Sequence, residues 1–110
     1  MKSPIFLQKA KPPKTVTFPL FVYHISGKSM LPTYKDNDKV LVNRWAYILF
    51  KPKVNDAVII FKKKVMIKRI REDKNNKFFV VGDNLSQSTD SRDFGLIEEK
   101  DILGKVLFKF

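Results

Sequence analysis

The 110-residue chain has no cysteine and no apolar run near the roughly 18 residues that a membrane-spanning helix needs. The absence of cysteine excludes a disulfide framework, a thiol nucleophile and a thiolate zinc site. The longest apolar run covers only residues 45–50, and the N-terminal segment holds no apolar core of signal-peptide length. We therefore expect a chain without a transmembrane anchor of its own, either cytoplasmic or peripheral to a membrane.

Arginine is also scarce, since it supplies four of the 22 basic residues behind the net charge of +11. This charge suits nucleic acid, an anionic membrane or an acidic substrate. Because arginine reads bases and phosphates better than lysine does, we expect no specific nucleic-acid partner. Residues 45–50, flanked by Arg44, Lys51 and Lys53, leave two alternatives: contact with an anionic membrane surface, or a loop that folds into the core.

Hydrophobic residues make up 44% of the chain and include ten phenylalanines, which is enough for one domain with a modest core. Short segments rich in Val, Ile and Phe alternate with polar turns and predict strands. These are residues 18–25, 39–43, 57–61, 65–71, 78–81 and 105–110, with hairpin tips at 62–64 and 73–76 and single helical turns at 31–34 and 98–102. The prediction is a mostly β fold, a small coiled antiparallel sheet over residues 17–110, after a basic arm at 1–16.

A serine at position 29 lies in the segment Ser-Gly-Lys-Ser-Met-Leu-Pro-Thr, residues 26–33. Gly27 permits an unusual backbone conformation just before Ser29, and Pro32 stiffens the chain just after it. A serine in such a turn can act as a nucleophile if a base removes its proton. Taken alone, the segment also fits an ordinary loop.

A lysine at position 68 lies within the predicted strand 65–71. Strand alternation puts Met66, Lys68 and Ile70 on one face, so the amine has an apolar neighbour on either side. Free lysine has a pKa of about 10.4 and can serve as a base only where burial lowers that value. The pattern fits either a buried base or a lysine that reaches across an apolar strand to water.

Together, the serine segment, Lys68-Arg69, and Gly82-Asp83-Asn84 running into Ser88-Thr89-Asp90-Ser91-Arg92 resemble the signal peptidase I family of serine endopeptidases. The resemblance covers about residues 25–106 and implies the same small β fold. It implies Ser29 as the nucleophile, Lys68 as the general base and Ser88 as the residue that positions the lysine.

The resemblance also implies an ion pair between Asp90 and Arg92 that fixes the loop, with Asp83 bracing it. The backbone N–H of Ser29 is the expected oxyanion donor. Gly27 stands where some members have a serine side chain, so the second donor stays unassigned. No metal or cofactor is needed for this chemistry, and the sole histidine, His24, is expected to be a strand residue.

Members of this family usually have Gly-Asp pairs before the strands that follow the serine segment. This chain has Asn37-Asp38 and Asn55-Asp56 instead, and it retains Gly82-Asp83. Asparagine is the side chain that best tolerates positive φ, so both asparagine pairs still predict tight turns.

The expected function is removal of an N-terminal signal or leader segment from a precursor protein or peptide. An alternative is maturation of a nickel-type superoxide dismutase precursor, because short members without an anchor resemble those maturation proteases. A second enzyme alternative is the peptidase domain of LexA-type repressors, which shares the Ser-Gly-x-Ser-Met turn with this chain. Those domains lack the Gly-Asp-Asn…Asp-Ser-Arg loop that this chain has. A further alternative is a basic binding module that has lost its activity.

Overall fold

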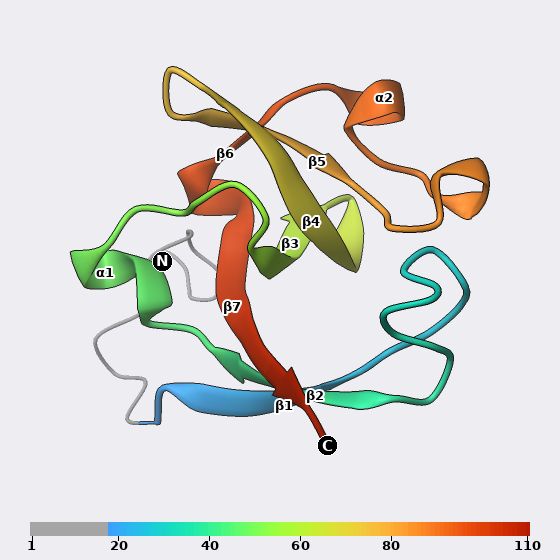
Figure 1. Cartoon of the computed structure of the whole chain (residues 1–110). Coiled ribbons are helices and arrows are strands. Elements are labelled where there is room, and N and C mark those ends of the chain that lie inside the picture. Colours follow the sequence, from blue (N-terminus) through green and yellow to red (C-terminus); the bar gives the residue numbers. More distant parts are fainter. Residues whose placement is uncertain (1–17) are drawn as a thin grey trace.

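Figure 1 shows the computed structural model of the chain, in which residues 18–110 are described. The basic arm expected at residues 1–16 lies outside the described residues. Seven antiparallel strands form one sheet in the order β1-β2-β7-β3-β4-β5-β6. The strands are β1 Leu20–His24, β2 Lys39–Asn43, β3 Ala57–Lys62, β4 Lys64–Lys74, β5 Lys77–Val81, β6 Ile97–Glu98 and β7 Ile102–Lys109. The predicted mostly β, antiparallel fold is therefore confirmed.

Helical structure is limited to four single turns in the described residues: α1 Ala46–Leu49, η1 Leu85–Gln87, α2 Ser91–Phe94 and η2 Glu99–Asp101. The turn expected at 98–102 is present as η2, and a backbone bond from Tyr34 N–H to the Met30 carbonyl closes a turn at the other expected place. The sequence patterns missed β6 and α2, because a two-residue strand and a four-residue helix carry no periodic signal.

The coiled sheet encloses two groups of buried side chains, and β3 contributes to both. Val58 and Ile60 face one group with Met66 and Ile70, whereas Ile59 faces the other. Strand alternation explains this division, because a strand buried on both faces can serve two cores at once. The central strands β3 and β4 are thus held rigidly from both sides.

Tight turns join the strands where asparagine or lysine adopts positive φ. Asn37 has a φ of 72° and Asn55 a φ of 82°, so the turns predicted at both Asn-Asp pairs are confirmed. The β3–β4 hairpin turns at Lys63, and the β4–β5 hairpin turns at Asn75 and Asn76, all with positive φ. Two successive residues with positive φ match the right-handed twist of the flanking strands.

Strand β4 changes partners along its length. Its first half, Lys64–Arg69, pairs with β3, and its second half, Arg69–Lys74, pairs with β5 after an irregularity between Ile70 and Glu72. Within the described chain, the edge of Lys64–Lys68 that faces away from β3 therefore pairs with no other strand. The β1–β2 connection and the loop after β5 lie on the same side of the molecule, at the right of Figure 1.

Residues 45–50 fold into the core only in part, so the core alternative is wrong for their second half. Tyr47 packs against the second buried group and donates its hydroxyl proton to Asp56 at 2.5 Å. Ile48, Leu49 and Phe50 are 49%, 84% and 70% exposed. No helix within residues 18–110 is long and apolar enough to cross a membrane.

Candidate active site

The turn that carries Ser29 is fastened to the rest of the molecule by backbone groups. Gly27 has a φ of 87°, and its N–H donates to Asp36 Oδ1 at 2.9 Å. The Ser29 carbonyl accepts from the Asn84 N–H at 2.8 Å, and Asn84 Nδ2 donates to the Lys28 carbonyl at 3.0 Å. These bonds join the serine turn to the loop after β5, while the Ser29 side chain stays partly exposed.

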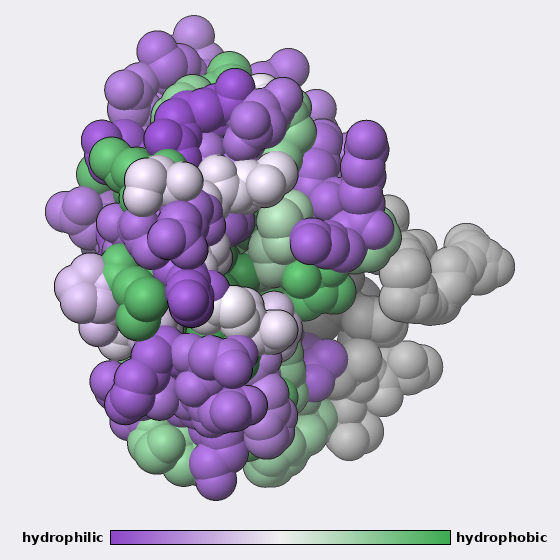
Figure 2. All heavy atoms as spheres, turned by 90° about the vertical axis from the view of Figure 1, so that its right-hand side faces the viewer, coloured by the Kyte–Doolittle hydropathy of each residue, from purple (hydrophilic) through white to green (hydrophobic). Residues whose placement is uncertain are grey.

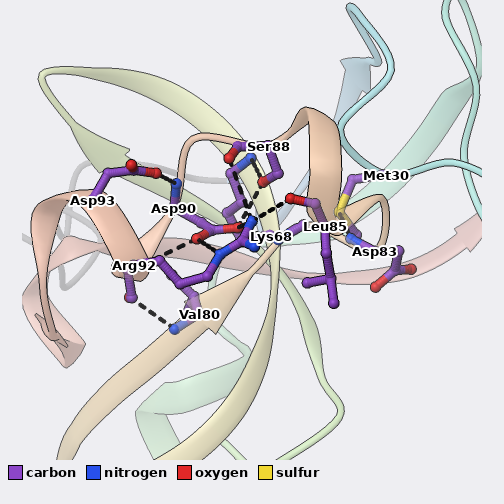
Figure 3. A network of polar contacts seen from close by, with 11 residues as sticks. Met30, Lys68, Val80, Asp83, Leu85, Ser88, Asp90, Arg92 and Asp93 are labelled. Carbon is purple, nitrogen blue, oxygen red and sulfur yellow. Dashed lines mark hydrogen bonds and ion pairs between the residues drawn. The ribbon is translucent and has the colours of Figure 1, made fainter.

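Lys68 is almost completely buried, with an exposed fraction of 3%. Its Nζ donates a hydrogen bond to Ser88 Oγ at 3.1 Å, as seen in Figure 3. Burial lowers the pKa of the Lys68 amine, and the negative charge of Asp90 acts in the opposite direction. The neutral amine is therefore more accessible here than for a lysine in water.

Ser88 links Lys68 to a fully buried carboxylate. The Ser88 hydroxyl donates to Asp90 Oδ2 at 2.7 Å, and Asp90 has an exposed fraction of 0%. A hydroxyl has only one proton to donate, so the oxygen of Ser88 must be the acceptor for Lys68. Asp90 thus determines in which direction the Ser88 hydroxyl points.

Asp90 is compensated by five donors around its two oxygens, which include the Ser88 hydroxyl and the Arg92 backbone N–H. Arg92 Nε donates to Oδ1 at 2.8 Å and Arg92 Nη2 to Oδ2 at 2.9 Å, and the Gly82 N–H donates to Oδ2 at 2.9 Å. Burial alone would raise the pKa of Asp90, but the hydrogen bonds from Arg92, Gly82 and Ser88 hold it well below its usual value. The ion pair of Asp90 with Arg92 is present, and Asp90 remains charged under ordinary conditions.

Asp83 lies in the same loop as Asp90, but its partner is Arg69 on β4 and not Arg92 of the loop. It accepts two parallel hydrogen bonds from Arg69, at 2.9 Å from Nε and 2.8 Å from Nη2. Arg69 follows Lys68 on β4, so this bidentate pair holds the loop against the strand that carries the lysine.

Position 82 requires glycine because a side chain has no room there, and not because of a positive φ. A Cβ at this position would lie 2.2 Å from Ser88 Oγ and 2.5 Å from the Ser29 carbonyl oxygen. Gly82 therefore lies where the serine turn, the Ser88 loop and β5 meet. The Gly-Asp pair that the chain retains at this place is therefore explained by close contact between segments.

Ser29 and Lys68 line one pocket of about 400 Å³. Its lining comes from the end of β1, the serine turn, the first half of β4 and the loop after β5: Tyr23, Ser26, Gly27, Lys28, Ser29, Lys64, Val65, Met66, Ile67, Lys68, Gln87 and Thr89. Figure 2 shows this side of the molecule, with a hollow across its middle whose floor is hydrophobic and whose surroundings are largely hydrophilic.

Ser29 and Lys68 both belong to the described part of the chain, and no hydrogen bond joins Ser29 Oγ to Lys68 Nζ. Hydrogen bonds of this kind are often long in a free enzyme and form with the substrate in place. His24 is exposed at the end of β1, and the pocket lining includes its neighbour Tyr23 but not His24.

Sequence reasoning missed three residues that organise the site. Asn84 clamps the serine turn, Arg69 binds Asp83, and the buried Ser91 Oγ accepts from the Val80 N–H at 2.9 Å. All three residues lie within the quoted motifs, which was the available signal. Their partners are distant in sequence, so no local pattern could reveal the contacts.

The fold and this pocket describe a small antiparallel β protein in which a buried lysine and a serine on a constrained turn line the same pocket. A family model described as "Signal peptidase, peptidase S26" matches residues 14–72 and 71–110. The chain therefore belongs to the signal peptidase, peptidase S26 family, as its motifs indicated.

Named relatives support this membership. Signal peptidase IB of Staphylococcus aureus is 59% identical over 34 residues, which cover 31% of this chain and 18% of that protein. Signal peptidase I V of Bacillus subtilis is 27% identical over an alignment 138 positions long, which covers 76% of this chain and 82% of that protein. The match thus spans less than a fifth of the staphylococcal relatives and most of the Bacillus one.

Proposed function

We propose that this chain is a serine endopeptidase that removes an N-terminal signal or leader segment from a precursor protein, with Ser29 as nucleophile and Lys68 as general base. One observation carries the proposal: the 3% exposed amine of Lys68 is held by Ser88 in the pocket that Ser29 also lines. Family membership supports the same reaction class.

In the first half of the reaction, Ser29 Oγ attacks the scissile carbonyl carbon while the neutral Lys68 amine takes its proton. The resulting ammonium donates that proton to the departing amine nitrogen, which leaves an ester on Ser29. This is the serine–lysine form of the logic of serine proteases. We assign the Ser29 N–H as a donor to the oxyanion, since it lies at the attacked centre.

In the second half, Lys68 takes a proton from a water molecule, which attacks the ester and releases Ser29. Ser88 and Asp90 are positioning residues in both halves. Because Ser88 accepts one N–H of Lys68, the lone pair of the neutral amine is left to turn towards Ser29. Fixing this direction in advance avoids an entropic cost in each turnover.

The substrate binds, in this proposal, as an extended strand along the unpaired edge of Lys64–Lys68. Backbone N–H and C=O groups of such an edge can add one more strand, with side-chain pockets below it. The edge ends at Lys68 and borders the pocket, so an added strand would pass Ser29. This arrangement suits a flexible leader better than a folded substrate.

Mass-spectrometric cleavage of two substrates tests the proposal. One is a peptide with an Ala-x-Ala signal site, and the other is a nickel-type superoxide dismutase precursor. Cleavage by the wild type and not by Ser29→Ala or Lys68→Ala supports the dyad, and the preferred substrate separates the two precursor classes. If folded wild-type protein cleaves neither substrate, with and without lipid, the alternative of an inactive basic binding module gains support.

We further propose peripheral contact with an anionic membrane through the exposed residues Ile48, Leu49 and Phe50. Lys51 and Lys53 follow this apolar group directly, and both line a second pocket of about 480 Å³ beside Leu49 and Phe50. Apolar side chains that enter the headgroup region, with lysines that meet anionic lipid, are a common peripheral anchor. Such contact would bring the site close to membrane-bound precursors.

A further inference from the structure

The mouth of the pocket that holds Ser29 and Lys68 is positively charged and lacks a balancing carboxylate. Lys28, Lys64 and Lys68 are among its twelve lining residues, and none of the twelve is Asp or Glu. Lys28 and Lys64 are exposed and form no ion pair within residues 18–110. Residues 1–17 contain no acidic residue either.

The carboxylates around the site are already engaged. Asp90 is enclosed by Arg92, Asp83 by Arg69, Asp93 accepts from the Asp90 N–H, and Asp36 accepts from the Gly27 N–H. They cannot turn to neutralise the two exposed lysines without losing these bonds. The positive charge at the mouth is therefore available to a bound molecule.

The two lysines lie at different distances from the reacting centre. Lys28 directly precedes Ser29, and its carbonyl is fixed by Asn84, so only its side chain is free to reach a ligand. Lys64 precedes Lys68 by four residues on the same face of β4, which corresponds to about 13 Å along a strand. Besides burial, the charge of Lys64 also lowers the pKa of Lys68, which places Lys64 within electrostatic reach of the site.

We propose that Lys28 and Lys64 are specificity residues that select precursors with acidic side chains near the cleavage point. The proposal rests on the proposed peptidase function and names the substrate class. A strand bound along Lys64–Lys68 would bring one substrate residue opposite Lys64, about four positions from the residue opposite Lys68. A second acidic position, within a residue or two of the scissile bond, would face Lys28.

The charge pattern also disfavours a lysine-rich flank at the same positions, because like charges across a bound strand repel. Signal peptides carry their basic region at the N-terminus, separated from the cleavage site by the apolar region. The lysine mouth is compatible with that arrangement only if the residues next to the cut are neutral or acidic. The two lysines therefore exclude precursors with basic residues next to the cleavage site.

A scan of one glutamate through a neutral peptide, over five positions on either side of the scissile bond, tests this inference. We expect two maxima of kcat/KM at low salt, each about two- to fivefold above the neutral parent, because exposed charge pairs contribute modestly and are screened by salt. Lys64→Gln should remove the distant maximum and Lys28→Gln the near one. The matched control Lys77→Gln, an exposed lysine on β5, should keep both.

Charge reversal gives the stricter test. Lys64→Glu should shift the preference at the distant position from glutamate to lysine, which a merely structural role of Lys64 would not do. Equal cleavage of all peptides at low salt, by wild type and both variants, would overturn the inference while leaving the peptidase proposal intact. If no peptide is cleaved, fluorescence anisotropy of the same labelled peptides on Ser29→Ala protein decides: tighter binding of the glutamate peptides supports the inference, and equal binding overturns it.

Discussion

Burial of Lys68 is the residue-level feature on which the proposed chemistry depends. Lys68 stands between Met66 and Ile70 along β4, with Ser88 as its hydrogen-bond partner. The low dielectric surroundings disfavour the ammonium form, and Asp90 opposes this effect only partly. The balance leaves a lysine that can exchange a proton at lower pH than a free lysine.

We expect kcat/KM to rise with pH through the lowered pKa of Lys68. In the proposed reaction the neutral amine is the base, so activity should be lost as pH falls and the amine takes up a proton. The acidic limb of the profile should lie below the value of about 10.4 for free lysine. Peptide cleavage measured across the neutral to alkaline range checks this, and a limb that coincides with free lysine would contradict a buried base.

Replacing Ser88 by alanine should lower kcat more than it changes KM. The variant removes the acceptor that orients the Lys68 amine, and misdirection of a catalytic group can cost about 100-fold in rate. Steady-state kinetics on one peptide measures the split between kcat and KM.

Ser88→Thr is the matched control, because it keeps a hydroxyl that can donate to Asp90 and accept from Lys68. It should recover part of the rate. A Ser88→Ala enzyme with wild-type kcat would show that Ser88 has no positioning role.

At the scale of elements, the site is a junction of three segments that are distant in the sequence. The serine turn precedes β2, Lys68 lies on β4, and the loop from Gly82 to α2 closes over both. Asn84 and Arg69 join this loop to its two neighbours, as described above. The position of Ser29 relative to Lys68 therefore depends on how tightly the loop approaches.

Gly82→Ala should reduce activity well beyond its effect on stability. The added methyl group would meet Ser88 Oγ and the Ser29 carbonyl, so the loop must move away from the serine turn. We expect a loss of about 1–3 kcal/mol in the free energy of unfolding from this overpacking. Urea denaturation and peptide cleavage, measured on the same protein, separate the two effects.

Gly104→Ala provides the comparison. Its methyl group would meet Val42 Cγ1 at 2.6 Å and the Asn43 carbonyl at 3.0 Å, between β7 and β2 and outside the pocket lining. It should destabilise the fold while the remaining folded protein cleaves normally. If both variants lose activity only in proportion to the loss of folded protein, close contact at Gly82 does not control the position of Ser29, and the prediction is wrong.

The whole molecule combines a high net positive charge with a group of exposed apolar residues at the end of α1. The net charge of +11 keeps the surface basic, while Leu49 and Phe50 stand out from a short helix with little cover. Exposed neighbouring apolar side chains of this size are typical of an interaction surface. Their place beside Lys51 and Lys53 favours an anionic lipid surface as the partner.

Leu49→Ser together with Phe50→Ser should reduce co-sedimentation with vesicles that contain anionic phospholipid by several-fold. The apolar contribution to binding scales with the buried area that these side chains supply. Added salt should weaken the binding of wild-type protein, since lysines supply part of it.

Phe61→Ser is the matched control, because Phe61 is also a half-exposed phenylalanine but lies on β3 away from α1. Equal sedimentation of all three proteins, or wild-type protein that stays in solution with anionic vesicles, would contradict the membrane proposal. Cleavage of a soluble peptide should be the same for all three proteins, since this surface lies outside the lining of the Ser29 pocket.

Local chemistry made much of the fold predictable. Runs of Val, Ile and Phe between polar turns located six of the seven strands, and Asn37 and Asn55 marked tight turns because few other side chains tolerate positive φ. The motifs also brought Ser29, Lys68, Ser88, Asp90 and Arg92 into view as one set, and the structure gathers all five around one pocket and its supporting loop.

Residue type and near neighbours were enough to predict six of the seven strands, the tight turns, the family and the absence of thiol chemistry. The burial of Lys68, the hydrogen bonds of Ser88 to Lys68 and Asp90, and the exposure of Leu49 and Phe50 became evident only in the folded chain. Burial and hydrogen-bond direction depend on contacts between distant segments, which no local pattern contains. Gly82 illustrates this best: its position is visible in the motif, but the crowding by Ser88 and Ser29 that requires glycine exists only after the chain has folded.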